Sequence, residues 1–211
     1  MMLTLYAHPL SSYCWKALIA LYENETPFST VVIDQNTYAE FKALWPLAKF
    51  PVLRDGEQII PEASLIIEHL DAHHRGRTRF LPDDADAAIT VRLWDRVFDN
   101  YVMTPMSKII ADILRPEGKR DPHGVEEARA LLRTAYDMIE AQLEGRVFIA
   151  GDAFSMADCA AAPSLYYAVR NEPLAASHVA TAAYLDRLKQ RPSFARTLEE
   201  AQPFFHLYPG A

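Results

Sequence analysis

Residues 5–28 read LYAHPLSSYCWKALIALYENETPF, and this stretch decides the fold. The apolar run Leu3 to Ala7, which ends before a His-Pro pair, is typical of a buried strand. Ser11-Ser12 then precedes an apolar segment at helical spacing, which predicts a helix with a serine N-cap. Phe28 to Ile33 is rich in β-branched and apolar residues and predicts a second strand. A strand–helix–strand unit of this kind favours a parallel strand pair with a crossover helix.

The next fifty residues extend the same domain. Tyr38 to Leu44 predicts a short helix, and apolar runs on either side of Asp55-Gly56 predict a β-hairpin. Pro61-Glu62 then opens a predicted helix over Ala63 to His73. The expected order is therefore β-α-β-α-β-β-α, an α+β domain.

A polar segment follows, His73 to Asp84, and we interpret it as a solvated linker that includes His73-His74. Beyond it the apolar residues recur at helical spacing, which predicts an all-helical second domain. We expect the first domain at residues 1–76, the linker at 77–85 and the helical domain at 86–211. The first helical stripe is expected to consist of Ile89, Leu93, Trp94, Val97 and Tyr101.

The bulk composition excludes several classes of function. A net charge of −7 makes a nucleic-acid-binding face unexpected, because phosphate binding needs clustered Lys and Arg. There is no apolar run of transmembrane length and no signal-peptide pattern, so we expect no membrane association and a cytoplasmic location. The two cysteines, Cys14 and Cys159, have no metal-binding spacing, so we expect a reducing compartment and no metal.

The N-terminus of the first helix is suited to a thiolate. A helix N-terminus presents free N–H groups and about half a positive charge. Lowering a thiol pKa from about 8.5 to about 6.5 requires about 2.7 kcal/mol. One charge-assisted hydrogen bond contributes about 1.5–3 kcal/mol and a helix end about 0.3–1 kcal/mol, so one hydroxyl donor is sufficient. Ser11 and Ser12 are the candidate donors, although both also suit a purely structural capping role.

Three segments, in order along almost the whole chain, resemble the cytosolic glutathione transferases. They are the opening stretch quoted above, KFPVLRDGEQIIPEASLIIEHLD at residues 49–71, and FIAGDAFSMADCAAAP at residues 148–163. The resemblance is to bacterial members, and the SSYCW segment is similar to that of zeta-like members. It implies a thioredoxin-like first domain, glutathione as co-substrate, a small hydrophobic electrophile as second substrate, and a homodimer. In the third segment, Ser155 and Asp158 form a variant of the capping box.

The resemblance also implies roles for individual residues. Ser11 takes the position of the serine that activates the thiol, with Ser12 as an alternative donor. Phe50 and a cis Pro51 would pair with the cysteinyl part of glutathione, and Lys49 would reach the glycyl carboxylate. Glu62 and Ser64 would hold the γ-glutamyl end, although the serine of the usual Glu-Ser pair is replaced here by Ala63.

Alternatives remain at the level of sequence. Tyr6 is a rival activator at the end of the first strand, and Cys14 is a candidate for a mixed disulfide, although it more readily packs inward as a small apolar group. A glutathione-dependent isomerase of the maleylacetoacetate type and a non-catalytic binding or regulatory protein are alternative functions. The second substrate is expected between the domains, in a cleft lined by Tyr101, Met103, Met106, Tyr166 and Tyr167. The C-terminal tail is expected either to cover this cleft or to pack on the body of the protein.

Overall fold

The first domain is built on a four-stranded mixed sheet. The computed structural model of the chain describes residues 2–209. Strands β1 (Leu3–Ala7), β2 (Phe28–Val32), β3 (Val52–Asp55) and β4 (Gln58–Pro61) lie in the order β2-β1-β3-β4. β1 pairs with β2 in parallel and with β3 antiparallel, and β3 pairs antiparallel with β4. The parallel pair and the hairpin expected from the sequence are both confirmed.

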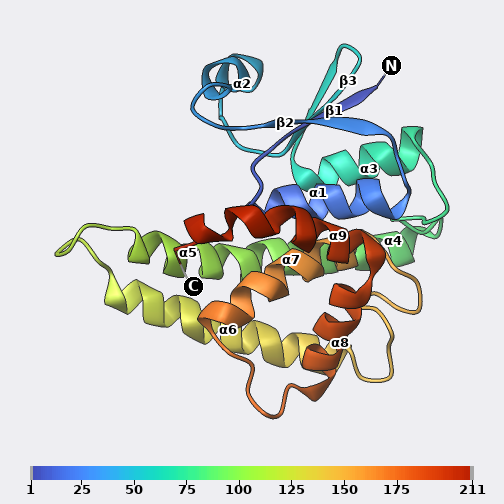
Figure 1. Cartoon of the computed structure of the whole chain (residues 1–211). Helices are drawn as coiled ribbons and strands as arrows, with labels where there is room; N and C mark the ends of the chain where they lie inside the picture. Colours follow the sequence, from blue (N-terminus) through green and yellow to red (C-terminus); the bar gives the residue numbers. More distant parts are fainter. Residues whose placement is uncertain (1, 210–211) are drawn as a thin grey trace.

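Helices cover both faces of this sheet. α1 (Ser12–Glu23) and α3 (Ala63–His73) lie between the sheet and the helical domain, while α2 (Tyr38–Leu44) lies on the opposite side (Figure 1). The alternation of side chains along β1 explains this arrangement. Leu3 and Leu5 are buried in the main core with α1 and α3, whereas Tyr6 points the other way and stacks on Phe41 of α2.

The second domain is a bundle of helices. Its elements are α4 (Ala85–Val97), a π-helical turn η1 (Phe98–Met103), α5 (Thr104–Ile113), α6 (Pro122–Gln142), α7 (Met156–Asn171), α8 (Val179–Gln190), α9 (Pro192–Ala201) and a 3₁₀ segment η2 (Gln202–Leu207). α7 is almost entirely buried and contacts α1, and α9 also contacts α1. The two domains therefore share one continuous hydrophobic core (Figure 1).

The expected apolar stripe along α4 and η1 is wrong in three of its five members. Trp94 and Val97 are buried, but Ile89, Leu93 and Tyr101 are 62, 57 and 49% exposed. The buried face of α4 instead runs through Ala88 and Val91. Helical spacing alone could not separate these faces, because apolar residues occur on both.

The connection between the domains is less solvated than expected. Phe80 is fully buried, and its amide donates to the Asp71 carboxylate at 2.9 Å. His74 is half-buried and its ring lies against Asp55 at 2.6 Å, so the interpretation of His73-His74 as a solvated linker is wrong for His74. Helix α4 begins at Ala85, one residue before the expected boundary.

The capping box at the start of α7 is confirmed. The Asp158 carboxylate accepts from the amide and the hydroxyl of Ser155, both at 2.8 Å. Its other oxygen accepts from the Ile149 amide at 3.2 Å and from the Tyr184 hydroxyl at 2.5 Å. One fully buried carboxylate thus ties α7 to α8 and to the preceding loop.

No helix within residues 2–209 is both long enough and apolar enough to cross a membrane.

Candidate functional site

A polar pocket of about 310 Å³ lies between the two domains. The first domain contributes residues before β3 and at the start of α3, and the helical domain contributes the end of α4 and η1. The lining residues are Tyr13, Lys49, Phe50, Pro51, Glu62, Ala63, Arg96, Asp99 and Asn100. Lys49 and Arg96 supply positive charge, and Glu62 and Asp99 supply negative charge. The pocket is therefore suited to a small zwitterion that carries carboxylate groups as well as an ammonium group.

The N-terminus of α3 forms one end of this pocket. Glu62 is the N-cap and has a φ of +68°, a conformation that non-glycine residues adopt rarely. Ala63 follows as the first helical residue, and helix geometry leaves its amide free for a ligand carboxylate. The first turn of α3 thus supplies an anion site without a serine hydroxyl at position 63.

Behind the polar pocket lies a buried ion cluster. The Lys16 ammonium is 2.5 Å from Asp95 and 2.8 Å from Asp99, and Lys16 and Asp95 are each 1% exposed. Arg96 also contacts both carboxylates, at 2.5 and 2.7 Å. Burial raises the pKa of Asp99, and the Lys16 charge opposes that shift. The cluster fixes Arg96 and Asp99 where they line the pocket.

Ser64 belongs to this cluster and not to the pocket wall. Its hydroxyl accepts from the Lys16 ammonium at 2.8 Å, donates to Asp95 at 2.8 Å and contacts Arg96. Among the residues that the structure describes, Ser64 lines neither the polar pocket nor the apolar pocket described next. Its side chain can therefore affect the polar pocket only indirectly, by holding charged residues such as Arg96 in place.

An apolar pocket of about 410 Å³ adjoins the polar one. The two pockets share Tyr13 and Phe50. The walls of the apolar pocket come from η1, α5, α7 and the C-terminal tail, and they include Met103, Met106, Ile110, Leu114, Tyr167, Leu207, Tyr208 and Pro209. Of the expected second-substrate residues, Met103, Met106 and Tyr167 line this pocket. Tyr101 is 49% exposed, and Tyr166 packs on Trp15 instead.

The N-terminus of α1 lies on the wall of the apolar pocket. Ser11 and Ser12 both line it, with Ser12 only 5% exposed. The Ser11 hydroxyl oxygen accepts from the Cys14 amide at 3.3 Å, as an N-cap does. A hydroxyl has a single proton to donate, and this contact does not use it. Ser11 can therefore cap the helix and donate to an anion in the pocket at the same time.

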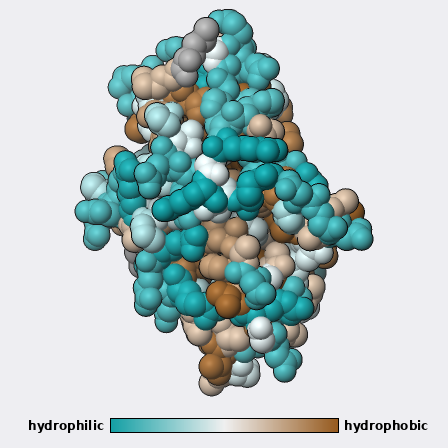
Figure 2. Space-filling model, turned by 90° about the vertical axis from the view of Figure 1, so that its right-hand side faces the viewer, coloured by the Kyte–Doolittle hydropathy of each residue, from teal (hydrophilic) through white to brown (hydrophobic). Residues whose placement is uncertain are grey.

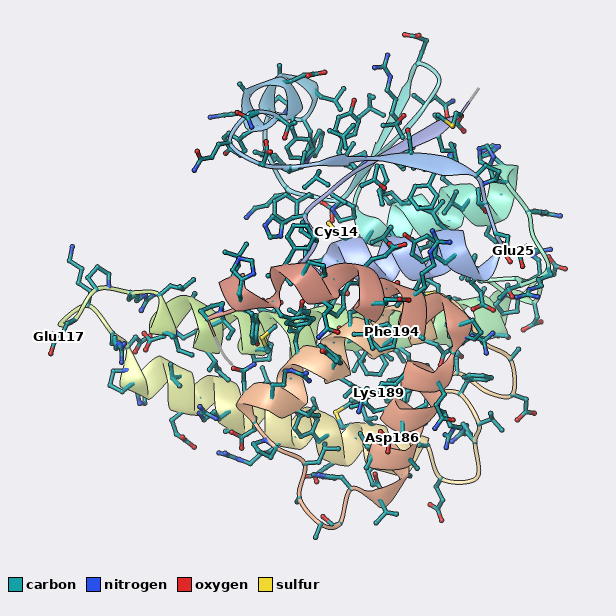
Figure 3. The ribbon with its side chains drawn as sticks, in the orientation of Figure 1. Cys14, Glu25, Glu117, Asp186, Lys189 and Phe194 are labelled. Atoms are coloured by element: carbon teal, nitrogen blue, oxygen red, sulfur yellow. The ribbon has the colours of Figure 1, made fainter. Side chains whose placement is uncertain are left out.

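The rival thiol-activating residues have different surroundings. Tyr6 is 7% exposed in the small core beneath α2, and among the described residues it lines neither pocket. Cys14 is fully buried and lies on the sheet side of α1 (Figure 3). Burial raises the pKa of Cys14 to about 12, and its sulfur accepts from the His8 amide at 3.3 Å. Cys14 therefore packs inward as a core residue, which agrees with the expectation from the sequence.

Tyr13, which lines both pockets, was not among the expected site residues. Burial and the charge of Asp99 raise the pKa of Tyr13 to about 12, so its phenol keeps its proton at neutral pH. The Phe50–Pro51 peptide bond that borders both pockets is cis. The His8 ring stacks on Phe50 with 5.5 Å between ring centroids, and burial lowers the pKa of His8.

Arg96, Asp99 and Asn100 were also missed, because they are distant in sequence from the first domain. One feature of the sequence could have indicated these residues. Asp95, Arg96 and Asp99 alternate with large apolar residues between Leu93 and Tyr101, and charges in such a position are expected to pair or to line a cavity.

Comparisons with known proteins identify relatives over nearly the whole chain. The family models "Glutathione S-transferase, N-terminal domain" and "Glutathione S-transferase, C-terminal domain" match residues 5–78 and 122–196. Glutathione S-transferase 3 of Zea mays is 30% identical over 207 residues, which covers 93% of each chain. Glutathione S-transferase F13 of Arabidopsis thaliana is 26% identical and covers 93% of this chain and 94% of its own. A glutathione S-transferase from Methylobacillus flagellatus, solved with glutathione bound, superposes with a TM-score of 0.84 at 25% identity, covering 92% of this chain and 98% of its own.

Proposed function

This chain belongs to the glutathione S-transferase family, and on that premise we propose that it ionises the thiol of glutathione at the N-terminus of α1. The resulting thiolate then attacks a small apolar electrophile, so that the glutathionyl group is transferred to it. One observation carries the proposal. A charged pocket and an apolar pocket meet at Tyr13 and Phe50, beside the serine N-cap of α1. The charged pocket suits the tripeptide, the apolar pocket suits the electrophile, and the thiol would lie where they meet.

Glutathione has two carboxylates and one ammonium group, and the polar pocket offers a partner for each. We assign the glycyl carboxylate to Lys49 and the peptide groups of the cysteinyl residue to the backbone of Phe50 before Pro51. The γ-glutamyl carboxylate would accept from the free Ala63 amide and from Arg96, and its ammonium would pair with Glu62 or Asp99. Ser64 contributes indirectly, because its hydroxyl holds Arg96 and Lys16 in the buried cluster.

Ser11 is the proposed thiol activator, and Ser12 is the nearest alternative. The hydroxyl proton of Ser11 stabilises the thiolate while its oxygen remains fixed by the Cys14 amide. The thiol proton leaves to solvent. In the chemical step the sulfur forms a bond to the electrophilic carbon, and the leaving group departs with the electron pair of its broken bond. Tyr6 has no part in this mechanism, because its ring packs against Phe41.

Calorimetry with glutathione and a conjugation assay with chlorodinitrobenzene test the proposal together. We expect saturable glutathione binding with a Kd below millimolar and measurable conjugation. Lys49→Met and Glu62→Gln should each weaken glutathione binding by about tenfold, the effect of one charged contact at a part-exposed site. Lys42→Met is a matched control on exposed α2 and should leave the Kd unchanged. An absence of binding at millimolar glutathione would contradict the proposal and support a non-catalytic protein.

We also propose a homodimer formed through the exposed side of α3 and α4. Leu65, Ile89 and Leu93 are 53, 62 and 57% exposed, and they accompany an ion pair between Arg92 and Glu68 at 2.8 Å. An apolar group of this kind rimmed by charge is typical of a protein interface. Leu93→Glu should therefore produce monomers in analytical ultracentrifugation. Leu131→Glu, at a leucine of α6 that is 41% exposed, should not, and a wild-type monomer at high micromolar concentration would contradict the proposal.

The finer class of the enzyme is a separate proposal. The SSYCW segment supports a zeta-like member, whereas relatives such as the Arabidopsis protein carry F designations. We infer a transferase, and we expect no isomerisation of a cis-diketo acid. Turnover of such an acid at a rate comparable to conjugation would restore the zeta-like assignment.

Two further proposals concern domain limits and compartment. We propose that residues 1–76 bind glutathione and residues 86–211 supply most of the electrophile pocket, with 77–85 as the connection. The free, buried thiols of Cys14 and Cys159 suit a reducing compartment such as the cytoplasm. Cell fractionation tests the location, and a secreted pool would contradict it.

A further inference from the structure

Two histidines and one aspartate converge at the end of α3 that faces away from the glutathione pocket. The Nε2 atoms of His69 and His74 lie 2.9 and 2.6 Å from the same oxygen of Asp55, Oδ2. All three ligand-type atoms lie within 4.8 Å of one another. His69 is six residues beyond Ala63, which places the group about 9 Å or more along the helix from the pocket.

From this cluster we propose that the chain binds one borderline divalent cation, best represented by Zn²⁺, through His69, His74 and Asp55. Two imidazole nitrogens and a carboxylate are a donor set that zinc accepts, with water in a fourth position. Ligands at 2.0–2.1 Å in a tetrahedron are about 3.3 Å apart. The two nitrogens lie 2.9 and 2.6 Å from Asp55 Oδ2, so metal binding requires each to move away from that oxygen by roughly 0.4–0.7 Å.

The three ligands come from rigid elements. Asp55 ends β3 and pairs with Gln58 across the hairpin, His69 lies within α3, and His74 is the C-cap of α3. The His74 amide donates to the Leu70 carbonyl at 2.8 Å, which fixes its backbone. Preorganisation of this kind reduces the entropy lost when an ion binds.

The charge balance also favours a cation. Within residues 2–209, the ion pairs of Asp55 are those with His69 and His74. The arginines that adjoin the cluster in sequence, Arg54 and Arg75, donate instead to the backbone carbonyls of Gly56 and Asp71. Among the described residues, no lysine or arginine forms an ion pair with this carboxylate. On metal binding, each imidazole presents its Nε2 lone pair, and the proton it held there moves to Nδ1 or to solvent.

The cluster is accessible to an ion. The side chains of His69, His74 and Asp55 are 11, 28 and 23% exposed. They lie on the side of the molecule that carries the end of α3, which is covered mainly by hydrophilic residues (Figure 2). Both cysteines are fully buried, so neither thiol competes for zinc in the folded chain.

Titration calorimetry of the full, tag-free chain with zinc chloride, without glutathione, tests this proposal. We expect one site per chain with a micromolar Kd. His74→Gln and Asp55→Asn should each weaken binding at least tenfold. His73→Gln is the matched control, because the His73 ring packs against His69 with 4.6 Å between ring centroids but lies outside the cluster. It should retain the Kd within about threefold, since no first-sphere ligand is lost.

The controls separate this proposal from the glutathione chemistry. Circular dichroism and glutathione calorimetry verify that each variant is folded and active, so a loss of zinc binding is not a loss of structure. Two results would overturn the proposal: no saturable heat with zinc at concentrations up to about 100 µM, or equal affinities in wild type, His74→Gln and Asp55→Asn. An equal loss in His73→Gln would overturn the assigned ligand set.

Discussion

Replacement of Lys16 by methionine should destabilise the whole chain and not only the first domain. Lys16 lies on α1, yet its ammonium contacts Asp95 of α4 and Asp99 of η1. Its removal leaves two buried carboxylates with Arg96 as their remaining cation. Breaking a buried ion pair by removing one partner costs about 3–5 kcal/mol. Because Arg96 still contacts both acids, we expect the lower limit, about 3 kcal/mol.

Urea and thermal unfolding measure this loss. For a chain of this size, 3 kcal/mol corresponds to a fall of about 6–12 °C in the unfolding midpoint. A double-mutant cycle with Asp95→Asn sharpens the test, since removing the acid removes the uncompensated charge. The double variant should be less destabilised than the sum of the single variants by at least about 1 kcal/mol. A loss below 1 kcal/mol for Lys16→Met, or strictly additive energies, would refute the reasoning.

Three further predictions follow from single contacts. The Asp158 carboxylate accepts four hydrogen bonds, and Asp158→Asn leaves one oxygen for these four donors, so two charge-assisted hydrogen bonds are lost. We expect this variant to lose about 3 kcal/mol of stability in urea unfolding. A loss below 1 kcal/mol would contradict this. Burial raises the pKa of Glu23, but hydrogen bonds from Arg191 and Ser193 outweigh it and lower the pKa below its usual value of 4.5. Wild type should therefore exceed Glu23→Gln in stability above about pH 4.5, by about 2 kcal/mol. The difference should shrink as the pH falls from about 4.5 and vanish once it has passed through the lowered pKa of the folded state; a difference that persists below that point would be inconsistent. Tyr208→Ala removes part of the wall of the apolar pocket and should raise the KM for an apolar electrophile about tenfold. The Kd for glutathione should stay constant. A parallel rise in both constants would mean that the C-terminal tail also contributes to the polar pocket.

The first domain was predictable because local signals agree with the global fold. The Asp55-Gly56 pair marks the hairpin turn, and Gly56 has the positive φ, +60°, that such a turn needs. The serine N-cap of α1 and the capping box of α7 are short-range patterns whose partners lie within three residues. These features need no knowledge of the tertiary structure.

The polar pocket was only half predictable. Lys49, Phe50, Pro51 and Glu62 lie in one segment of sequence, and the resemblance covers that segment. Arg96 and Asp99 come from another domain, and their approach depends on the polar contacts of Asp95 with Lys16 of α1 and Ser64 of α3. The position of Ser64 illustrates the same limit, because its hydroxyl contacts Lys16, which is 48 residues away in sequence.

The cluster of Asp55, His69 and His74 was not predicted from the sequence, for a related reason. Cysteine spacing excludes a thiolate site, but it does not detect ligands that the hairpin and the end of α3 bring together. The polar segment after the predicted helix indicates a solvated linker, and that interpretation includes His74. Only the packing of the β3–β4 turn against α3 places Asp55 beside it.

The pKa of the bound glutathione thiol tests the central assignment most directly. Ultraviolet difference absorbance of the thiolate, followed against pH, measures it in wild type, Ser11→Ala, Ser12→Ala and Ser11→Thr. Loss of one charge-assisted bond of about 1.5–3 kcal/mol should raise the thiol pKa by roughly 1–2 units in Ser11→Ala. Ser11→Thr, which keeps both cap and hydroxyl, should restore it, and Ser12→Ala should leave it unchanged. An unchanged thiol pKa in Ser11→Ala, with the rise found in Ser12→Ala instead, would contradict the account.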